Sequence, residues 1–144
     1  MVNESIFPAT HSWFAAEGME DGKPCMFRGR EIPSGLVGDI SLPHIFVIAL
    51  PYPITDPTGL PTGAQYNEIE AFERRCIDRV EEDRLGILTF VRTFNGTIRY
   101  FLYVSDINVV SQAIEADVNS VGAHVAAGDD SEWREFKAFL RGMR

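Results

Sequence analysis

The chain has 144 residues, of which 45% are hydrophobic, and a formal net charge of -8 from 21 acidic and 13 basic residues. This length suits one compact domain spanning 1–144. The acidic balance disfavours DNA, RNA and anionic membranes, whose phosphates it repels, and it favours a basic protein as partner. The longest apolar run, 45–50, is far shorter than the ~20 residues that cross a membrane, and residues 1–5 lack the features of a signal peptide. We therefore expect a cytoplasmic protein.

The region 43–127 predicts the alternation of strands and helices found in a ferredoxin-like split βαβ sandwich, an α+β fold with an antiparallel sheet and helices on one face. The strongest signal is Asn95-Gly96, a two-residue hairpin turn between two runs of β-branched and aromatic residues. Right-handed crossovers then give the strand order 121–127, 44–50, 97–104, 86–93. Between these strands we predict a helix over 65–84 and a second helix capped by Ser105 or Asp106.

Two segments flank this core. Residues 1–40 predict an N-terminal β-hairpin with strands at 12–17 and 24–32, which either joins an edge of the sheet or folds over it. Residues 130–141 predict a C-terminal helix that Asp129 or Asp130 caps and that carries apolar residues at helical spacing, namely Trp133, Phe136 and Leu140.

One face of the sheet is predicted to be free of the two core helices. Alternation along the second hairpin strand assigns Arg99, Phe101 and Tyr103 to it. This pattern resembles the base-stacking strand of an RNA-recognition motif, but the glycine before the first aromatic is missing and the charge has the wrong sign. We favour a second hydrophobic core, in which the N-terminal hairpin places Trp13 and Phe27 over these aromatic rings.

Arg28 and Arg30 form a second candidate site on the N-terminal hairpin. Their spacing places both guanidinium groups on one strand face, which the partner strand shares through Trp13 and Glu17. Two such groups can clamp a carboxylate or a phosphate. An internal ion pair between Arg28 and Glu17 is the alternative that we favour.

No group of residues indicates a catalytic or metal site. His44 and His124 are predicted roughly 10 Å apart on antiparallel strands, although His11 remains free to approach either of them. The two cysteines, Cys25 and Cys76, lack metal or redox spacing, so we predict buried, reduced thiols. We expect no catalytic residue, no metal and no cofactor.

Several short motifs stand out along the chain: a tryptophan strand ending in Glu17, Pro24 with Arg28, Pro43 before an apolar strand, Gly59-Leu60-Pro61 before the Ile69-Glu70 helix, and Asp130, Trp133, Phe136 and Phe139 at the end. Together they resemble an uncharacterised bacterial family of domains of unknown function, which is remotely similar to the regulator of ribonuclease E activity B. The resemblance spans about Trp13 to Leu140. It implies a small acidic protein that binds an enzyme and has no catalytic residues of its own.

The sequence thus supports three hypotheses. The first is a non-enzymatic, cytoplasmic protein-binding or regulatory module that meets a basic partner through Trp13, Glu17 and Arg28, with a contribution from the loop 51–64. The second is an anion-binding protein or enzyme, with a pocket between the hairpin and the open sheet face in which Arg28, Arg99 and Tyr103 hold the ligand. The third is self-association through an exposed edge strand at 86–93. No pattern specifies an oligomeric state.

Overall fold

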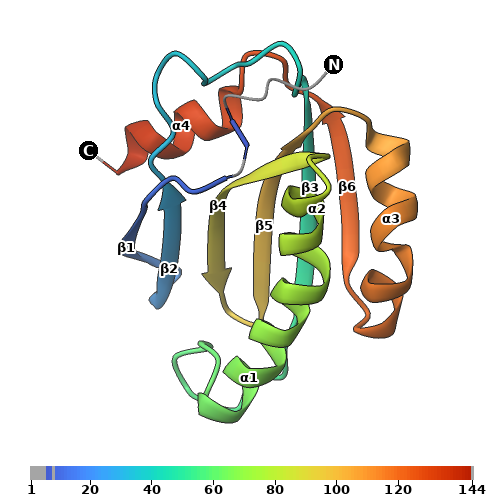
Figure 1. Ribbon diagram of the computed structural model, residues 1–144. Helices are drawn as coiled ribbons and strands as arrows, with labels where there is room; N and C mark the ends of the chain where they lie inside the picture. The colour runs from blue at the N-terminus through green and yellow to red at the C-terminus, as the bar shows by residue number, and fades with distance from the viewer. Residues whose placement is uncertain (1–5, 8, 144) are drawn as a thin grey trace.

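A computed structural model describes residues 6–7 and 9–143, and in this part of the chain six strands form one antiparallel sheet (Figure 1). The strands are β1 (Trp13–Glu20), β2 (Lys23–Arg30), β3 (His44–Pro51), β4 (Gly86–Phe94), β5 (Thr97–Val104) and β6 (His124–Asp129). Their order across the sheet is β1-β2-β4-β5-β3-β6. The predicted α+β class and the predicted order of the last four strands are confirmed. The expectation drawn from residues 1–5 lies outside the described residues.

Two-residue turns set the register of both hairpins. Asn95 and Gly96 have φ angles of 43° and 94°, and Asp21 and Gly22 have φ angles of 51° and 76°. Positive φ at both central positions is the geometry whose twist matches that of the flanking strands, and Asn, Asp and Gly adopt it most readily. The hairpin predicted at Asn95-Gly96 is therefore confirmed.

The N-terminal hairpin lies in the plane of the sheet because β2 pairs with β4 along its length. Cys25 to Gly29 are opposite Phe94 to Phe90 in this pairing. The hypothesis of self-association through an edge strand at 86–93 is therefore wrong, since β2 covers that edge. β1 is the outermost strand instead.

The core helices pack on one face of the sheet (Figure 1). The first helix continues through α1 (Gly63–Phe72), a π-helical segment η1 (Glu73–Ile77) and α2 (Asp78–Glu82), and the second is α3 (Ile107–Ser120). At the start of α1 the Gln65 side chain accepts a hydrogen bond from the backbone N–H of Thr62, 2.7 Å long. Asp106 caps α3 by accepting a bond from the N–H of Val109, 3.1 Å long. Cys25 and Cys76 are free and buried, as predicted.

The third helix of the described chain, α4 (Arg134–Gly142), covers the opposite face of the sheet at one end. The Trp133 ring stacks on Tyr103 at 4.4 Å between centroids, and its indole N–H donates to the carbonyl oxygen of Leu42. Farther along, Phe139 stacks on Phe90 at 4.4 Å. Asp130 caps the helix, because its carboxylate accepts bonds from the N–H groups of residues 134 and 135.

The predicted second core is therefore present, but α4 rather than the N-terminal hairpin covers it. The hairpin uses its backbone to pair with β4, so it extends the sheet and cannot lie over Tyr103 or Phe101. Phe27 does reach this core, 5.8 Å from Phe139 between ring centroids. Trp13 lies on the other face, so the predicted stacking of Trp13 on these aromatic rings is wrong.

Candidate protein-binding site

The outer edge of β1 is open along its whole length in the described structure. The N–H of Glu31 donates to the carbonyl oxygen of Ser12, 2.8 Å away, which makes these two residues a hydrogen-bonded pair. Hydrogen-bonded and non-hydrogen-bonded pairs alternate in an antiparallel ladder. The residues that turn both N–H and C=O toward the open edge are therefore Trp13, Ala15, Glu17 and Met19.

The same four residues present their side chains on one face of β1, the face shared with α1 and α2. Trp13 is 38% exposed and Met19 is 71% exposed, so β1 presents two large apolar side chains to solvent. The guanidinium carbon of Arg30 lies 4.5 Å from the centre of the Trp13 ring, and that of Arg28 lies 5.7 Å from it. These cation–π contacts hold the ring in place while part of its surface remains open to solvent.

Arg30 connects β1 to the helix behind it. Its side chain is buried and forms an ion pair with Glu81, with a shortest N–O distance of 2.5 Å. It also donates to the carbonyl oxygens of Leu88 and Ala9, and Glu81 in turn accepts the backbone N–H of Leu88 at 2.8 Å. Arg30 and Glu81 each make further hydrogen bonds besides their ion pair, which supports Trp13 from behind, although the buried Nε of Arg30 has no partner among the described residues.

His11 lies next to this network. Burial lowers the pKa of its imidazole, the positive charge of Arg30 lowers it further, and Glu81 partly opposes both effects. The Nδ1 atom of His11 is buried and has no hydrogen-bond partner among the described residues. The neutral ring therefore packs at the start of β1 without adding charge to the surface.

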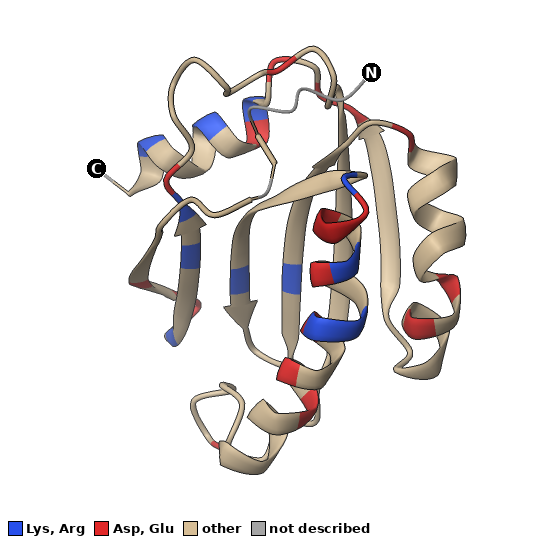
Figure 2. Ribbon diagram, in the orientation of Figure 1, with Lys and Arg blue, Asp and Glu red and all other residues tan. Residues whose placement is uncertain are grey.

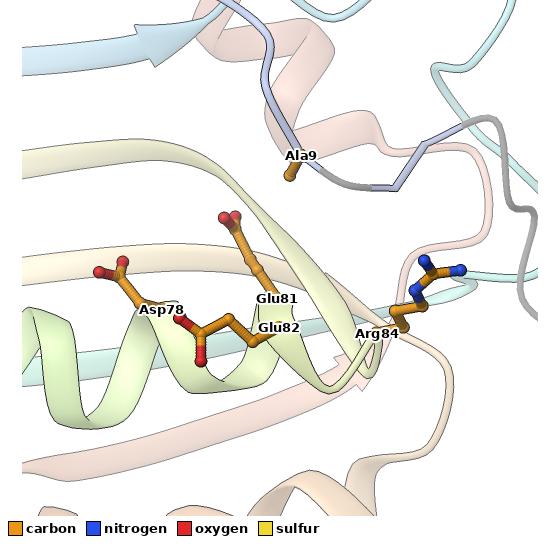
Figure 3. A pocket seen from close by; sticks show the side chains of 5 residues that line it. All are labelled: Ala9, Asp78, Glu81, Glu82 and Arg84. Atoms are coloured by element: carbon orange, nitrogen blue, oxygen red, sulfur yellow. The ribbon is translucent and has the colours of Figure 1, made fainter.

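An acidic cleft opens beside the ion pair (Figure 3). Its volume is about 400 Å³, and Ala9, Asp78, Glu81, Glu82 and Arg84 line it. In Figure 3 the side chains of Asp78 and Glu82 lie close together, and Glu81 points toward Ala9. Because Glu81 is paired with Arg30 and Arg84 also lines the cleft, Asp78 and Glu82 are the carboxylates that attract a cationic side chain, since lysine and arginine offer several donors to carboxylate oxygens.

Arg28 pairs with a different acid from the one predicted. Its guanidinium lies 3.1 Å from Glu73, which also accepts the hydroxyl of Tyr100 at 2.6 Å. Burial raises the pKa of Tyr100, and the neighbouring Glu73 carboxylate raises it further. The predicted Arg28–Glu17 ion pair is wrong, because η1 brings Glu73 over Arg28 whereas Glu17 is opposite Met26.

The five predicted binding residues fall on two faces of the sheet. Trp13, Glu17 and Arg28 lie together on the helix side, as predicted for the hairpin surface. Arg99 and Tyr103 lie on the opposite face, and Tyr103 is buried beneath Trp133 with its hydroxyl bonded to Asp130. The predicted anion clamp of Arg28, Arg99 and Tyr103 is therefore not assembled.

The histidines are also far apart along the sheet. His44 is opposite Asp129 and His124 is opposite Ala49, five positions farther along β6, which corresponds to about 16 Å rather than the expected 10 Å. Within residues 6–7 and 9–143 there is no cluster of three or more His, Cys, Asp or Glu suited to a metal ion. No helix in the same part of the chain has the length and apolar character to cross a membrane.

Two charged residues at these surfaces, Glu81 and Arg92, are not among the predicted site residues, although their spacing in the sequence indicates where they lie. Glu81 follows Ile77 by four positions, so it shares the buried side of the helix and is not simply solvated. Arg92 is opposite Arg99 because the two-residue turn Asn95-Gly96 fixes that register. Both signals come from spacing.

Comparison with known proteins supplies a family but no activity. Residues 12–141 match the model of a family described only as of unknown function, DUF695. No curated protein and no solved structure matches this chain. The remote similarity to the regulator of ribonuclease E activity B stays a prediction. The matched region begins one residue before β1 and ends within α4, so it contains both the open edge and the covered second core, and the chain belongs to the DUF695 family of unknown function.

Proposed function

We propose that the protein is a non-enzymatic, cytoplasmic protein-binding or regulatory module that takes a basic, extended segment of a partner protein along β1. The observation that carries this proposal is that Trp13, Ala15 and Met19 combine exposed apolar side chains with unpaired backbone groups on one edge strand, where Glu17 also turns its backbone groups outward. Natural sheets normally protect such an edge with charges, bulges or short strands.

Strand addition explains both features. A partner segment that pairs with β1 satisfies the outward N–H and C=O groups, and main-chain hydrogen bonds of this kind provide affinity. Its side chains on the helix side then meet Trp13 and Met19. A tryptophan that is already held in place loses little conformational freedom on binding, and this residue type is enriched among the contacts that dominate binding energy.

Charge favours a basic partner. Figure 2 shows that much of α2 is acidic. Asp78, Glu81 and Glu82 line the cleft, and Glu81 is the partner of Arg30, the residue that contacts Trp13. Glu17 adds a further carboxylate on β1 itself, and the whole chain carries -8. Complementary charge accelerates association and sets the register of the partner.

The cysteines support the assignment to the cytoplasm. Two free thiols suit a reducing compartment, where disulfides are rare.

We also infer that β3 to β6, with the intervening helices, form a ferredoxin-like core. The order β4-β5-β3-β6 and the placement of both core helices on one face support that inference.

The decisive experiment removes one outward amide without disturbing the sheet. In Ala15→Pro the lost N–H points away from β2, so the β1–β2 ladder remains intact and proline is tolerated at an edge position. Ala15→Ser is the matched control because it keeps the N–H. Trp13→Ala tests the exposed ring separately.

Immobilised wild-type protein and the three variants would each be exposed to cell lysate at low and raised salt. Proteins retained by the wild type and Ala15→Ser but lost with Ala15→Pro and Trp13→Ala, and weakened by salt, support the proposal. Slower hydrogen exchange at the amides of residues 13, 15, 17 and 19 in the complex would locate the added strand. Equal retention by Ala15→Pro, or no specific retention at all, contradicts it.

A further inference from the structure

The face of the sheet opposite the core helices is covered at one end only. In the register of the sheet, the aromatic residues Phe90 and Phe101 form one row, and they stack at 4.1 Å between centroids beneath α4. The next row lies farther from α4 and crosses all six strands. Its members, from β1 to β6, are Ala16, Phe27, Arg92, Arg99, Ala49 and His124.

This row places two arginines side by side. Arg92 and Arg99 are direct cross-strand partners, and Figure 2 shows the two basic positions next to each other on β4 and β5. Like charges directly opposite each other destabilise a sheet. Burial lowers the pKa of Arg92, and the charge of Arg99 lowers it further. The repulsion between Arg92 and Arg99 costs stability, and a bound anion would offset it.

Among residues 6–7 and 9–143, the chain compensates only one of the two charges. Arg92 forms an ion pair with Glu20 and lies over the Phe94 ring, 4.9 Å from its centre. Arg99 makes no ion pair and no side-chain hydrogen bond with any other residue that the structure describes. One guanidinium group in this row is therefore available to an external anion.

The other side of Arg99 leaves room for such a ligand. Its neighbour in the row is Ala49, whose side chain is a single methyl group, and His124 follows on β6. Arg99 and His124 are thus two strand spacings apart, about 10 Å between their backbones, and both project from the same face. The exposed imidazole of His124 can donate a hydrogen bond toward the space above Ala49.

We propose that Arg99 and His124 bind the phosphate group of a small phosphate monoester above Ala49. A phosphate monoester carries nearly two negative charges near neutral pH, and a guanidinium group binds phosphate in a bidentate manner. The adjacent row offers Phe101, Val47 and Ala126 as an apolar surface for the body of the ligand. The site lies on the opposite face from Trp13 and does not depend on the function proposed above.

Phenyl phosphate is the probe that tests this site, because it combines the phosphate with an aromatic body. It would be titrated into the protein at constant ionic strength, followed by calorimetry and by the NMR signals of the arginine Nε–H groups. Inorganic phosphate and phenol are the two partial ligands. Arg99→Gln removes the free guanidinium, and Arg74→Gln on the exposed surface of η1 removes an equal charge from the other face.

We expect the wild type and Arg74→Gln to bind phenyl phosphate equally and Arg99→Gln to bind it about tenfold more weakly, which is the scale of one charged hydrogen bond. Inorganic phosphate should bind more weakly than phenyl phosphate and phenol should not bind. The Nε–H signal of Arg99 should move first in the wild type, a result independent of any variant's folding. Equal losses in the two variants, or signals that move elsewhere, would overturn the proposal.

Discussion

At the scale of single residues, the most consequential interaction is the buried ion pair between Arg30 and Glu81. Arg30 is 5% exposed, so its charge depends on Glu81 and on the two carbonyl oxygens that it contacts. Removing one member of a buried pair leaves an uncompensated charge, which costs far more than the pair contributes. The ion pair thus acts as a constraint on where β2 and α2 meet.

Glu81→Gln should therefore lower the free energy of unfolding by about 3–5 kcal/mol, because it leaves Arg30 buried without a counter-ion. Urea denaturation followed by circular dichroism measures this. Glu70→Gln is the matched control, since it breaks the exposed pair with Arg74 and should cost less than about 0.5 kcal/mol. Equal losses in the two variants would mean that the Arg30–Glu81 pair is solvated in solution.

Asp130 makes the stability depend on pH. Burial opposes its ionisation, but hydrogen bonds from the Tyr103 hydroxyl and from two backbone N–H groups outweigh burial and lower its pKa. A lowered folded-state pKa stabilises the fold above the unfolded pKa of about 3.9, and this contribution is lost as the pH falls through the folded value.

Asp130→Asn should accordingly lose less stability than the wild type between pH 7 and pH 3. Urea denaturation at several pH values measures the difference between the two proteins. The other carboxylates titrate in both proteins, so the comparison isolates Asp130. A constant stability difference across this range would show that Asp130 is not stabilised in its ionised form.

At the scale of elements, the approach of α4 to the sheet depends on a glycine. A Cβ atom on Gly29 of β2 would lie 2.6 Å from the Phe139 ring and close to Phe14 as well. Gly128 of β6 has no neighbouring atom within 4 Å of the same position. The absence of a side chain at Gly29 thus allows the aromatic stack of α4 to rest on the strand.

Gly29→Ala should destabilise the protein by about 1–3 kcal/mol, the usual cost of overpacking a core. Gly128→Ala adds the same methyl group to the other edge of the sheet and should leave stability nearly unchanged. Thermal unfolding of the two variants gives the comparison. If both variants unfold at the same temperature, α4 is more loosely attached than its ring contacts indicate.

The same elements show which parts of the fold could be predicted. The β4–β5 hairpin was predictable because the Asn95-Gly96 turn is encoded locally. The position of the N-terminal hairpin was not, since two sheet edges were free and only the long-range pairing of β2 with β4 selects one. The π-helical segment η1 also escaped detection, because a single widened turn hardly disturbs the apolar spacing.

The candidate sites follow the same division. Trp13, Glu17 and Arg28 share a face because alternation within one hairpin places them there, so sequence periodicity suffices. The contact of Arg28 with Glu73 depends on how the first helix crosses the sheet, which no local pattern specifies. Arg99 was correctly assigned to the face away from the core helices, whereas Tyr103 is buried there because α4 returns over it.

At the scale of the whole molecule, the net charge of -8 affects folding and association in opposite directions. Self-repulsion among excess carboxylates destabilises the compact state, and salt screens it, with a Debye length of about 10 Å at 0.1 M. The attraction between the acidic cleft beside β1 and a basic partner is screened in the same way. Salt should therefore strengthen the fold and weaken the complex.

We expect the melting temperature of the isolated protein to rise between low salt and about 0.5 M sodium chloride, where screening shortens the Debye length to a few ångströms. Retention of a partner on β1 should fall over the same range. Scanning calorimetry and the retention experiment measure the two quantities separately. Glu82→Gln removes one cleft charge without touching the Arg30–Glu81 pair, so it should reduce both salt effects. If salt lowers the melting temperature and the retention together, it acts by loosening the fold, and the charge of the cleft does not select the partner.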